Sequence, residues 1–144
     1  MSQRRISQNE RLMFVTTCTK NRNPIFSDDA HARVAIESLY QIQRWFPFFL
    51  YAFVIMPDHC HFLLKVPEPG TISRIMYTYK RSVAFAIGKP VWQRRFYVKH
   101  VSEPGRIIDY IHVNPVRHNL CKRTDEYQWS SASGKWYVSE LTLM

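Results

Sequence analysis

The chain has 144 residues, 46% hydrophobic and 15% aromatic, so it is long enough to bury the core of one domain spanning residues 1–144 and is unlike a disordered tail. Twenty Lys and Arg against eleven Asp and Glu give a net charge of +9, which favours a polyanionic partner such as nucleic acid or an anionic membrane surface. No apolar run approaches the roughly 20 residues of a membrane-spanning helix, and no apolar signal core follows Met1, so we expect no membrane segment.

The first half of the chain is predicted to form a strand, a helix and a pair of strands. Residues 12–18 are rich in β-forming residues, and a helical pattern follows over about residues 30–46, after the capping residues 27–29. Apolar, β-forming residues at 48–55 and 62–66 flank a Met-Pro-Asp segment, which predicts two strands joined by a turn.

The second half is predicted to form a helix, a strand and a further helix. Thr71 or Ser73 can cap a helix that ends near residue 87, residues 91–98 form a strand, and a third helix runs over about residues 106–114. The order β-α-β-β-α-β plus a C-terminal helix predicts an α+β fold of the ferredoxin-like, split βαβ type. In that fold an antiparallel sheet carries two helices on one face, and the extra helix carries Tyr110.

Two histidines lie one residue apart where the strand pair turns. On a strand, His59 and His61 point to one face, near the middle of the open sheet, and Cys60 points inward as a small hydrophobe. Two adjacent imidazoles on a rigid strand can chelate a divalent ion. Taken alone, however, a His-x-His pair is more often two surface or hydrogen-bonded histidines. Cys18, Cys60 and Cys121 are widely spaced, which fits free thiols in a reducing cytoplasm and disfavours a Cys-rich zinc site.

The third helix carries a second group of chemically useful residues. Tyr110 and Asn114 are four residues apart and share a helix face. A tyrosine hydroxyl is a candidate nucleophile, and an Asn oxygen is a hard ligand suited to Mg²⁺ or Mn²⁺. With the two imidazoles this gives two nitrogens and one oxygen around a metal with open positions. The alternative is that Tyr110 packs at a helix edge and Asn114 ends the helix before Pro115.

Basic side chains interleaved with aromatic ones are the pattern expected of a protein that binds single-stranded nucleic acid. Each such residue is individually more often solvated surface. The candidate DNA-binding residues are Arg4, Arg5, Arg74, Lys80, Arg81, Trp92, Gln93, Arg94 and Arg95.

Four segments carry a family resemblance that covers nearly the whole chain. They are Met-Pro-Asp-His-Cys-His-Phe, Trp-Gln-Arg-Arg-Phe-Tyr, Asp-Tyr-Ile-His-Val-Asn-Pro-Val-Arg-His-Asn-Leu and Trp-Ser-Ser. In this order they resemble the single-tyrosine HUH transposases, and most closely the REP-associated tyrosine transposases. The chain departs from the family pattern at Cys60, where a bulky hydrophobe is usual, and in a shorter interval between Trp92 and Tyr110. Related insertion-sequence transposases usually carry Gln in place of Asn114.

The resemblance implies an enzyme that cuts and rejoins single-stranded DNA at hairpin sequences through a 5′-phosphotyrosine intermediate. It implies that Tyr110 is the nucleophile and that His59, His61 and Asn114 hold Mg²⁺ or Mn²⁺. The partner would be single-stranded or hairpin DNA, with either a monomer or a homodimer as the acting form, since some relatives exchange the tyrosine helix. The residues alone leave open a non-catalytic hairpin DNA- or RNA-binding module of ferredoxin-like fold.

Overall fold

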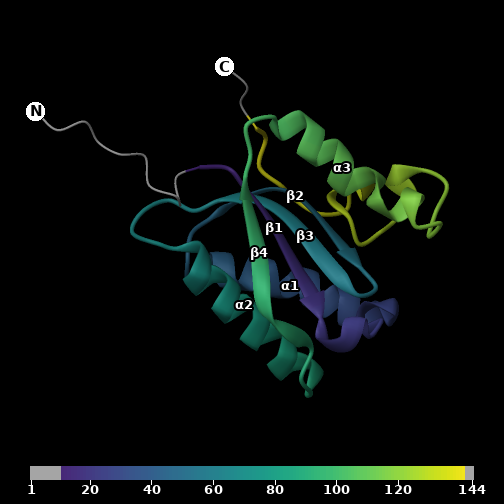
Figure 1. Ribbon diagram of the computed structural model, residues 1–144, viewed down its shortest axis with the longest axis horizontal. Helices are drawn as coiled ribbons and strands as arrows, with labels where there is room; N and C mark the ends of the chain where they lie inside the picture. Colours follow the sequence, from purple (N-terminus) through teal and green to yellow (C-terminus); the bar gives the residue numbers. More distant parts are fainter. Residues whose placement is uncertain (1–10, 142–144) are drawn as a thin grey trace, which may run out of the picture.

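The computed structural model describes residues 11–141, and within them it forms a four-stranded sheet and three α-helices (Figure 1). The elements in chain order are β1 (Met13–Thr19), α1 (Asp29–Gln43), β2 (Phe49–Met56), β3 (His59–Lys65), α2 (Ile72–Ile87), β4 (Trp92–His100) and α3 (Pro104–Arg117). Short 3-10 helices cover Lys20–Arg22, Ile25–Ser27, Thr124–Glu126 and Ser131–Ser133. The predicted order of elements is confirmed. None of the helices in this part of the chain is long and apolar enough to cross a membrane.

The sheet has the strand order β2-β3-β1-β4, and every neighbouring pair is antiparallel. This is the arrangement expected of a split βαβ fold, so the predicted α+β, ferredoxin-like class is confirmed. Helices α1 and α2 cover one face of the sheet, and α3 lies on the other face (Figure 1).

The alternation of side chains along β3 assigns residues to the two faces. Cys60 and Phe62 belong to the core formed with α1 and α2, and both are fully buried. Cys60 therefore packs inward, as predicted. Leu63 points to the opposite face, where Ile111 of α3 packs against it together with side chains of β2. The sheet thus has two apolar layers, a large one under α1 and α2 and a smaller one under α3.

The helix ends follow from local capping chemistry. The Asp28 carboxylate accepts hydrogen bonds from the backbone N–H groups of Ala30 and His31 at the start of α1. The Thr71 hydroxyl accepts one from the N–H of Arg74 at the start of α2. Gly88 ends α2 in the left-handed conformation, with φ of 86°, which glycine adopts without steric penalty. The predicted caps at 27–29 and at Thr71 are confirmed.

Helix α3 is longer than predicted at both ends. It begins at Pro104, whose missing N–H would have no helical partner at that position, and it continues beyond Asn114 to Arg117. The expectation that Asn114 ends the helix is therefore wrong. Asn114 and Pro115 are buried, and this tertiary burial outweighs the local cost of a proline inside a helix. Asn114 is thus held in regular helical backbone.

The segment after α3, for which the sequence suggested no structure, lies along the outer side of β2. The N–H of Ile55 donates to the carbonyl of Trp129 at 2.8 Å, and the N–H of Ser139 donates to the carbonyl of Leu50 at 2.8 Å. The Tyr127 hydroxyl also donates to the Ile55 carbonyl at 2.6 Å. The segment therefore pairs with backbone groups that an edge strand would otherwise leave open.

Candidate active site

The two histidines of β3 form a close pair on the sheet face that carries α3. The ring centroids of His59 and His61 lie 4.8 Å apart, and the residues are 7% and 6% exposed. The turn before β3 is tight, so the strand already begins at His59, opposite Met56 of β2. The pair consequently lies at the end of a central strand, and the expectation of a position near the middle of an open face is corrected.

Each imidazole has one ring nitrogen held by a neighbouring side chain. His59 Nδ1 lies 2.7 Å from a carboxylate oxygen of Asp58, whose other oxygen accepts from Arg22 Nε at 3.0 Å. A carboxylate only accepts, so His59 donates through Nδ1 and keeps its lone pair on Nε2. His61 Nδ1 lies 2.9 Å from the hydroxyl of Thr16, which pairs with His61 across β1 and β3. Such outer hydrogen bonds orient the histidine ligands of metal sites.

Burial keeps both imidazoles neutral. It lowers the pKa of His59, and the opposing hydrogen bond and charge of Asp58 do not reverse this shift. Burial, with a smaller contribution from His59, lowers the pKa of His61 to about 3. For Asp58, burial raises the pKa, but its hydrogen bond with His59 and the charge and hydrogen bond of Arg22 outweigh burial, so that the pKa of Asp58 is lowered. The His59–Asp58 contact is therefore a hydrogen bond from a neutral imidazole to a carboxylate, and neutral imidazole is the form that binds metals.

Helix α3 brings its polar face to the histidine pair. The Tyr110 ring lies 5.7 Å from the His61 ring and 5.8 Å from the Phe14 ring, and its side chain is 42% exposed. Two turns further on, the His118 ring centroid lies 6.2 Å from that of His59. The His118 Nδ1 lies 3.0 Å from the backbone carbonyl oxygen of Asn114. Residues 110, 114 and 118 share one helix face, so Asn114 lies between two contacts with the histidine pair.

The donors at this place fit a divalent metal ion. Nε2 of His59 is left free by its Asp58 contact, and Asn114, which is 4% exposed, lies one helical turn after Tyr110 and carries an amide oxygen. Within residues 11–141, no group of three or more His, Cys, Asp or Glu side chains is placed to hold a metal. A metal at this site would accordingly need the Asn114 oxygen beside the two imidazoles, a mixed set that suits Mg²⁺ or Mn²⁺.

The predicted DNA-binding residues of α2 lie on the other side of the sheet from the histidines. Arg74 is exposed, with its guanidinium 5.8 Å from the Phe46 ring centre, and Arg81 lies 5.6 Å from the Tyr77 ring centre. Lys80 is committed to structure, because its ammonium donates to two backbone carbonyls of β4, at 2.6 Å and 3.2 Å. Figure 1 shows α2 and α3 on opposite faces. The structure therefore does not bring these three cations to the histidine pair.

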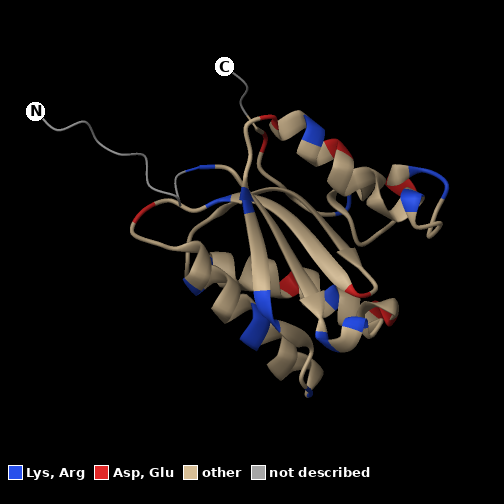
Figure 2. Ribbon diagram, viewed as in Figure 1, with Lys and Arg blue, Asp and Glu red and all other residues tan. Residues whose placement is uncertain are grey.

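The predicted DNA-binding residues of β4 divide between structure and surface. Trp92 packs on Phe26 and donates through its indole N–H to the Lys80 carbonyl at 3.1 Å, so it has a structural role. Arg94 and Arg95 are exposed and Gln93 is half-buried. Figure 2 shows Lys and Arg along β4 and no acidic residue on that strand. Arg4 and Arg5 lie outside the described residues.

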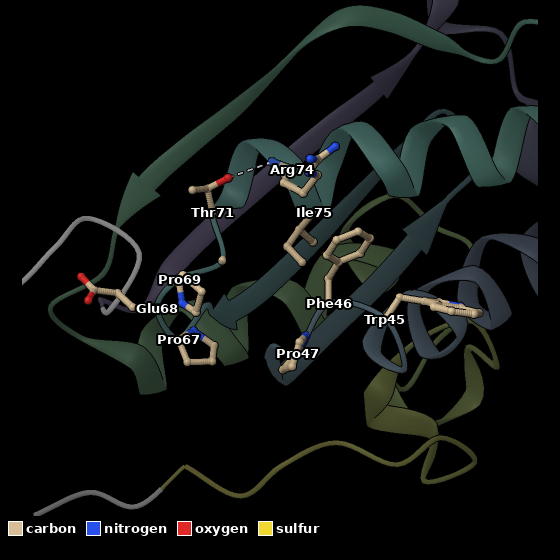
Figure 3. Close-up of a pocket in the computed structure, with 10 residues that line it drawn as sticks. Trp45, Phe46, Pro47, Pro67, Glu68, Pro69, Thr71, Arg74 and Ile75 are labelled. Atoms are coloured by element: carbon tan, nitrogen blue, oxygen red, sulfur yellow. Dashed lines mark hydrogen bonds between the residues drawn. The ribbon is translucent and has the colours of Figure 1, made fainter.

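A cavity of about 550 Å³ lies away from this chemistry, between the end of α1 and the start of α2. Trp45, Phe46 and Arg74 line it together with the Pro-rich turn before α2 (Figure 3). Its walls are mainly apolar and it contains none of the histidines. We therefore place the candidate active site at the histidine pair and not at this cavity.

Three residues around the pair were not predicted as site residues. Asp58 directly precedes His59, and an acid beside a candidate ligand was a usable signal. His118 lies one turn beyond Asn114 and becomes visible only when the helix is extended past Pro115. Thr16 is 45 residues from His61, and nothing short of the strand register identifies it.

Comparison with known proteins identifies the family. The family described as "transposase IS200 like" matches residues 9–114, which is more than half of the chain. The protein belongs to this family.

Individual relatives agree with this assignment. The chain is 28% identical over 99 residues to a REP-associated tyrosine transposase of Escherichia coli K12, a match that covers 65% of this chain and 60% of that protein. A solved structure of a REP-associated tyrosine transposase bound to a REP hairpin superposes with a TM-score of 0.78 at 24% identity, covering 100% of this chain and 94% of the other. A Deinococcus radiodurans chain described as a transposase candidate gives 0.58 at 23% identity, covering 77% and 95%. At these identities the two structures establish the fold.

Proposed function

We propose that the protein cleaves and rejoins single-stranded DNA at hairpin sequences, with Tyr110 as the nucleophile and with Mg²⁺ or Mn²⁺ held by His59, His61 and Asn114. The observation that carries this proposal is the contact between Tyr110 and His61, whose ring centroids are 5.7 Å apart within one chain. A half-exposed tyrosine hydroxyl can act as a nucleophile, and the two neutral imidazoles beside it are oriented as metal ligands. The named relative bound to a REP hairpin supports hairpin DNA as the substrate.

In the proposed reaction the Tyr110 oxygen attacks a phosphorus atom of the DNA strand. The bond from phosphorus to the tyrosine oxygen forms, the bond to the 3′-oxygen breaks, the phenol proton is lost, and the departing 3′-oxygen gains a proton. The products are a 5′-phosphotyrosine and a free 3′-hydroxyl. The 3′-hydroxyl of a second strand end then attacks the same phosphorus and releases Tyr110, so the phosphodiester is restored without ATP.

The remaining residues of the site position the reacting groups. Asp58 and Thr16 hold the two imidazoles with their Nδ1 atoms occupied, and helix α3 sets Tyr110 one turn from Asn114. The bound ion would supply positive charge against the negative charge that develops on the phosphate. The apolar packing of Ile111 under α3 keeps this helix on the sheet, so the nucleophile approaches from a fixed side.

DNA binding is proposed for the exposed cations of the predicted set. Their charges would neutralise backbone phosphates, which makes affinity depend on salt. This group comprises Arg74, Arg81, Arg94 and Arg95, with Gln93 beside it and with Arg4 and Arg5 in the undescribed N-terminal residues. Lys80 and Trp92 contribute by fixing β4 to α2. We further propose that residues 1–144 act as one domain in the cytoplasm, with Tyr110 acting beside His61 of its own chain.

A covalent-adduct assay tests the proposal. The purified protein is incubated with labelled single-stranded DNA from the hairpin repeats that flank its gene, with Mg²⁺ or Mn²⁺, and boiled in detergent. We expect a protein–DNA band that is absent with Tyr110→Phe and with a chelator. Tight binding without an adduct under either ion would instead support a non-catalytic hairpin-binding module. Absence of both binding and adduct would reject the DNA function altogether.

A further inference from the structure

One row of residues across the sheet connects the histidine pair to the open edge strand. Directly paired residues of neighbouring strands point to the same face. Thr16 of β1 pairs with His61 of β3 on one side and with Tyr97 of β4 on the other. Tyr97 is therefore on the same face as the histidines. Two strand spacings of about 4.8 Å place its backbone about 10 Å from that of His61.

The Tyr97 side chain is open to solvent although it lies on the face that carries the site. It is 59% exposed, because α3 packs mainly over β2 and β3, away from β4. Its neighbours in sequence, Phe96 and Val98, point to the other face and pack against the core. Among residues 11–141, no hydrogen bond or aromatic ring contact fixes the Tyr97 ring.

The surroundings of Tyr97 are cationic. Lys99 lies on the same face two residues along β4, where it pairs with Phe14, and it is exposed. Arg95 precedes Tyr97 by two residues and is also exposed. The strand contains no Asp or Glu, as Figure 2 shows. Charges on an edge strand also prevent aggregation, but that purpose requires no exposed aromatic ring among them.

We propose that Tyr97 is a base-stacking platform for a nucleotide that flanks the scissile phosphate, with Lys99 beside it contacting the strand's phosphate backbone. This inference rests on the proposed function, since it takes Tyr110 as the point of cleavage. A single strand that crosses β1 from Tyr97 arrives at Phe14 and His61, the two rings that Tyr110 contacts. Stacking on an aromatic ring accepts any base, so Tyr97 adds affinity and position without sequence selectivity.

The test measures DNA binding without cleavage. Tyr110→Phe protein in chelator is titrated into a short mixed-sequence single-stranded oligonucleotide that carries 2-aminopurine, and binding is followed by anisotropy and by quenching of the base. Tyr97→Ala is added to this background, with Tyr97→Phe as the conservative variant. Tyr137→Ala is the matched control, because Tyr137 is 79% exposed and lies near β2 at the opposite edge of the sheet.

We expect Tyr97→Ala to raise Kd by about tenfold or more and to reduce 2-aminopurine quenching, while Tyr97→Phe and Tyr137→Ala stay within about twofold. Equal affinity and equal quenching for Tyr97→Ala and its parent would overturn the stacking role and leave the proposed cleavage function intact. A parent protein that binds no single-stranded DNA would reject the proposed function itself. Circular dichroism checks that each variant is folded. We expect it to be, because both tyrosine side chains are exposed.

Discussion

Replacing Thr16 by valine tests whether the hydrogen bond between Thr16 and His61 orients His61 to bind a metal ion. Valine keeps the shape of threonine but lacks the hydroxyl, so it removes the 2.9 Å contact to His61 Nδ1. His61 is 6% exposed, and little water is available to replace the lost partner. An unsatisfied buried polar group costs about 1–3 kcal/mol. When a metal-binding histidine loses the group that hydrogen-bonds to its other ring nitrogen, the affinity for the metal falls by about 10- to 100-fold.

Calorimetric titration with Mn²⁺ and urea denaturation measure the two effects separately. Thr16→Ser keeps the hydroxyl and is the matched control. We expect Thr16→Val to bind Mn²⁺ at least about tenfold more weakly and to unfold at lower urea, with Thr16→Ser close to the parent in both measurements. If folded Thr16→Val binds Mn²⁺ as tightly as the parent, the reasoning from hydrogen bond to ligand position is refuted.

Three further predictions follow from the layout of the chain. Because Tyr110 lies against His61 of the same chain, a mixture of Tyr110→Phe and His59→Ala should form no adduct; adduct formation would show a dimer that exchanges the tyrosine helix. Gly88→Ala should lower the unfolding free energy by about 1–2 kcal/mol, since its φ is 86°, and an unchanged urea midpoint would contradict this. Phe62→Ala in the core should cost about 3–5 kcal/mol, whereas Phe85→Ala, at 90% exposure, should cost less than about 0.5 kcal/mol.

The fold was predictable because its signals are local. Runs of apolar, β-forming residues mark the strands, Asp28 and Thr71 mark helix starts, and Gly88 marks a helix end. The inward position of Cys60 followed from its place between two histidines on a strand. The end of α3 was not predictable in this way. Asn114 before a proline is a local stop signal, and only burial in the assembled protein shows that the helix continues past it.

The candidate site was predictable only in its motif residues. His59, His61, Tyr110 and Asn114 belong to two short segments, and helix or strand periodicity assigns each a face. The contacts of Thr16 and Tyr97 depend on the register of β1 with its two neighbours, which no sequence spacing reveals. The predicted cations of α2 resemble those of β4 in charge and aromatic context, and only the layers of the fold show that α2 lies on the face away from the histidines.

The two faces of β3 place different residues in the large core and beside the candidate site. Phe62 and Cys60 fill the core under α1 and α2, whereas His59 and His61 meet α3 and the open half of the sheet. Substitutions at the even positions should therefore unfold the protein before they alter a reaction. Substitutions of the histidines should leave a folded protein without metal, because neither histidine belongs to the two apolar clusters of the core. A register shift of one residue would exchange the two roles, which is why the pairing of β1 with β3 matters to the site as much as to the fold.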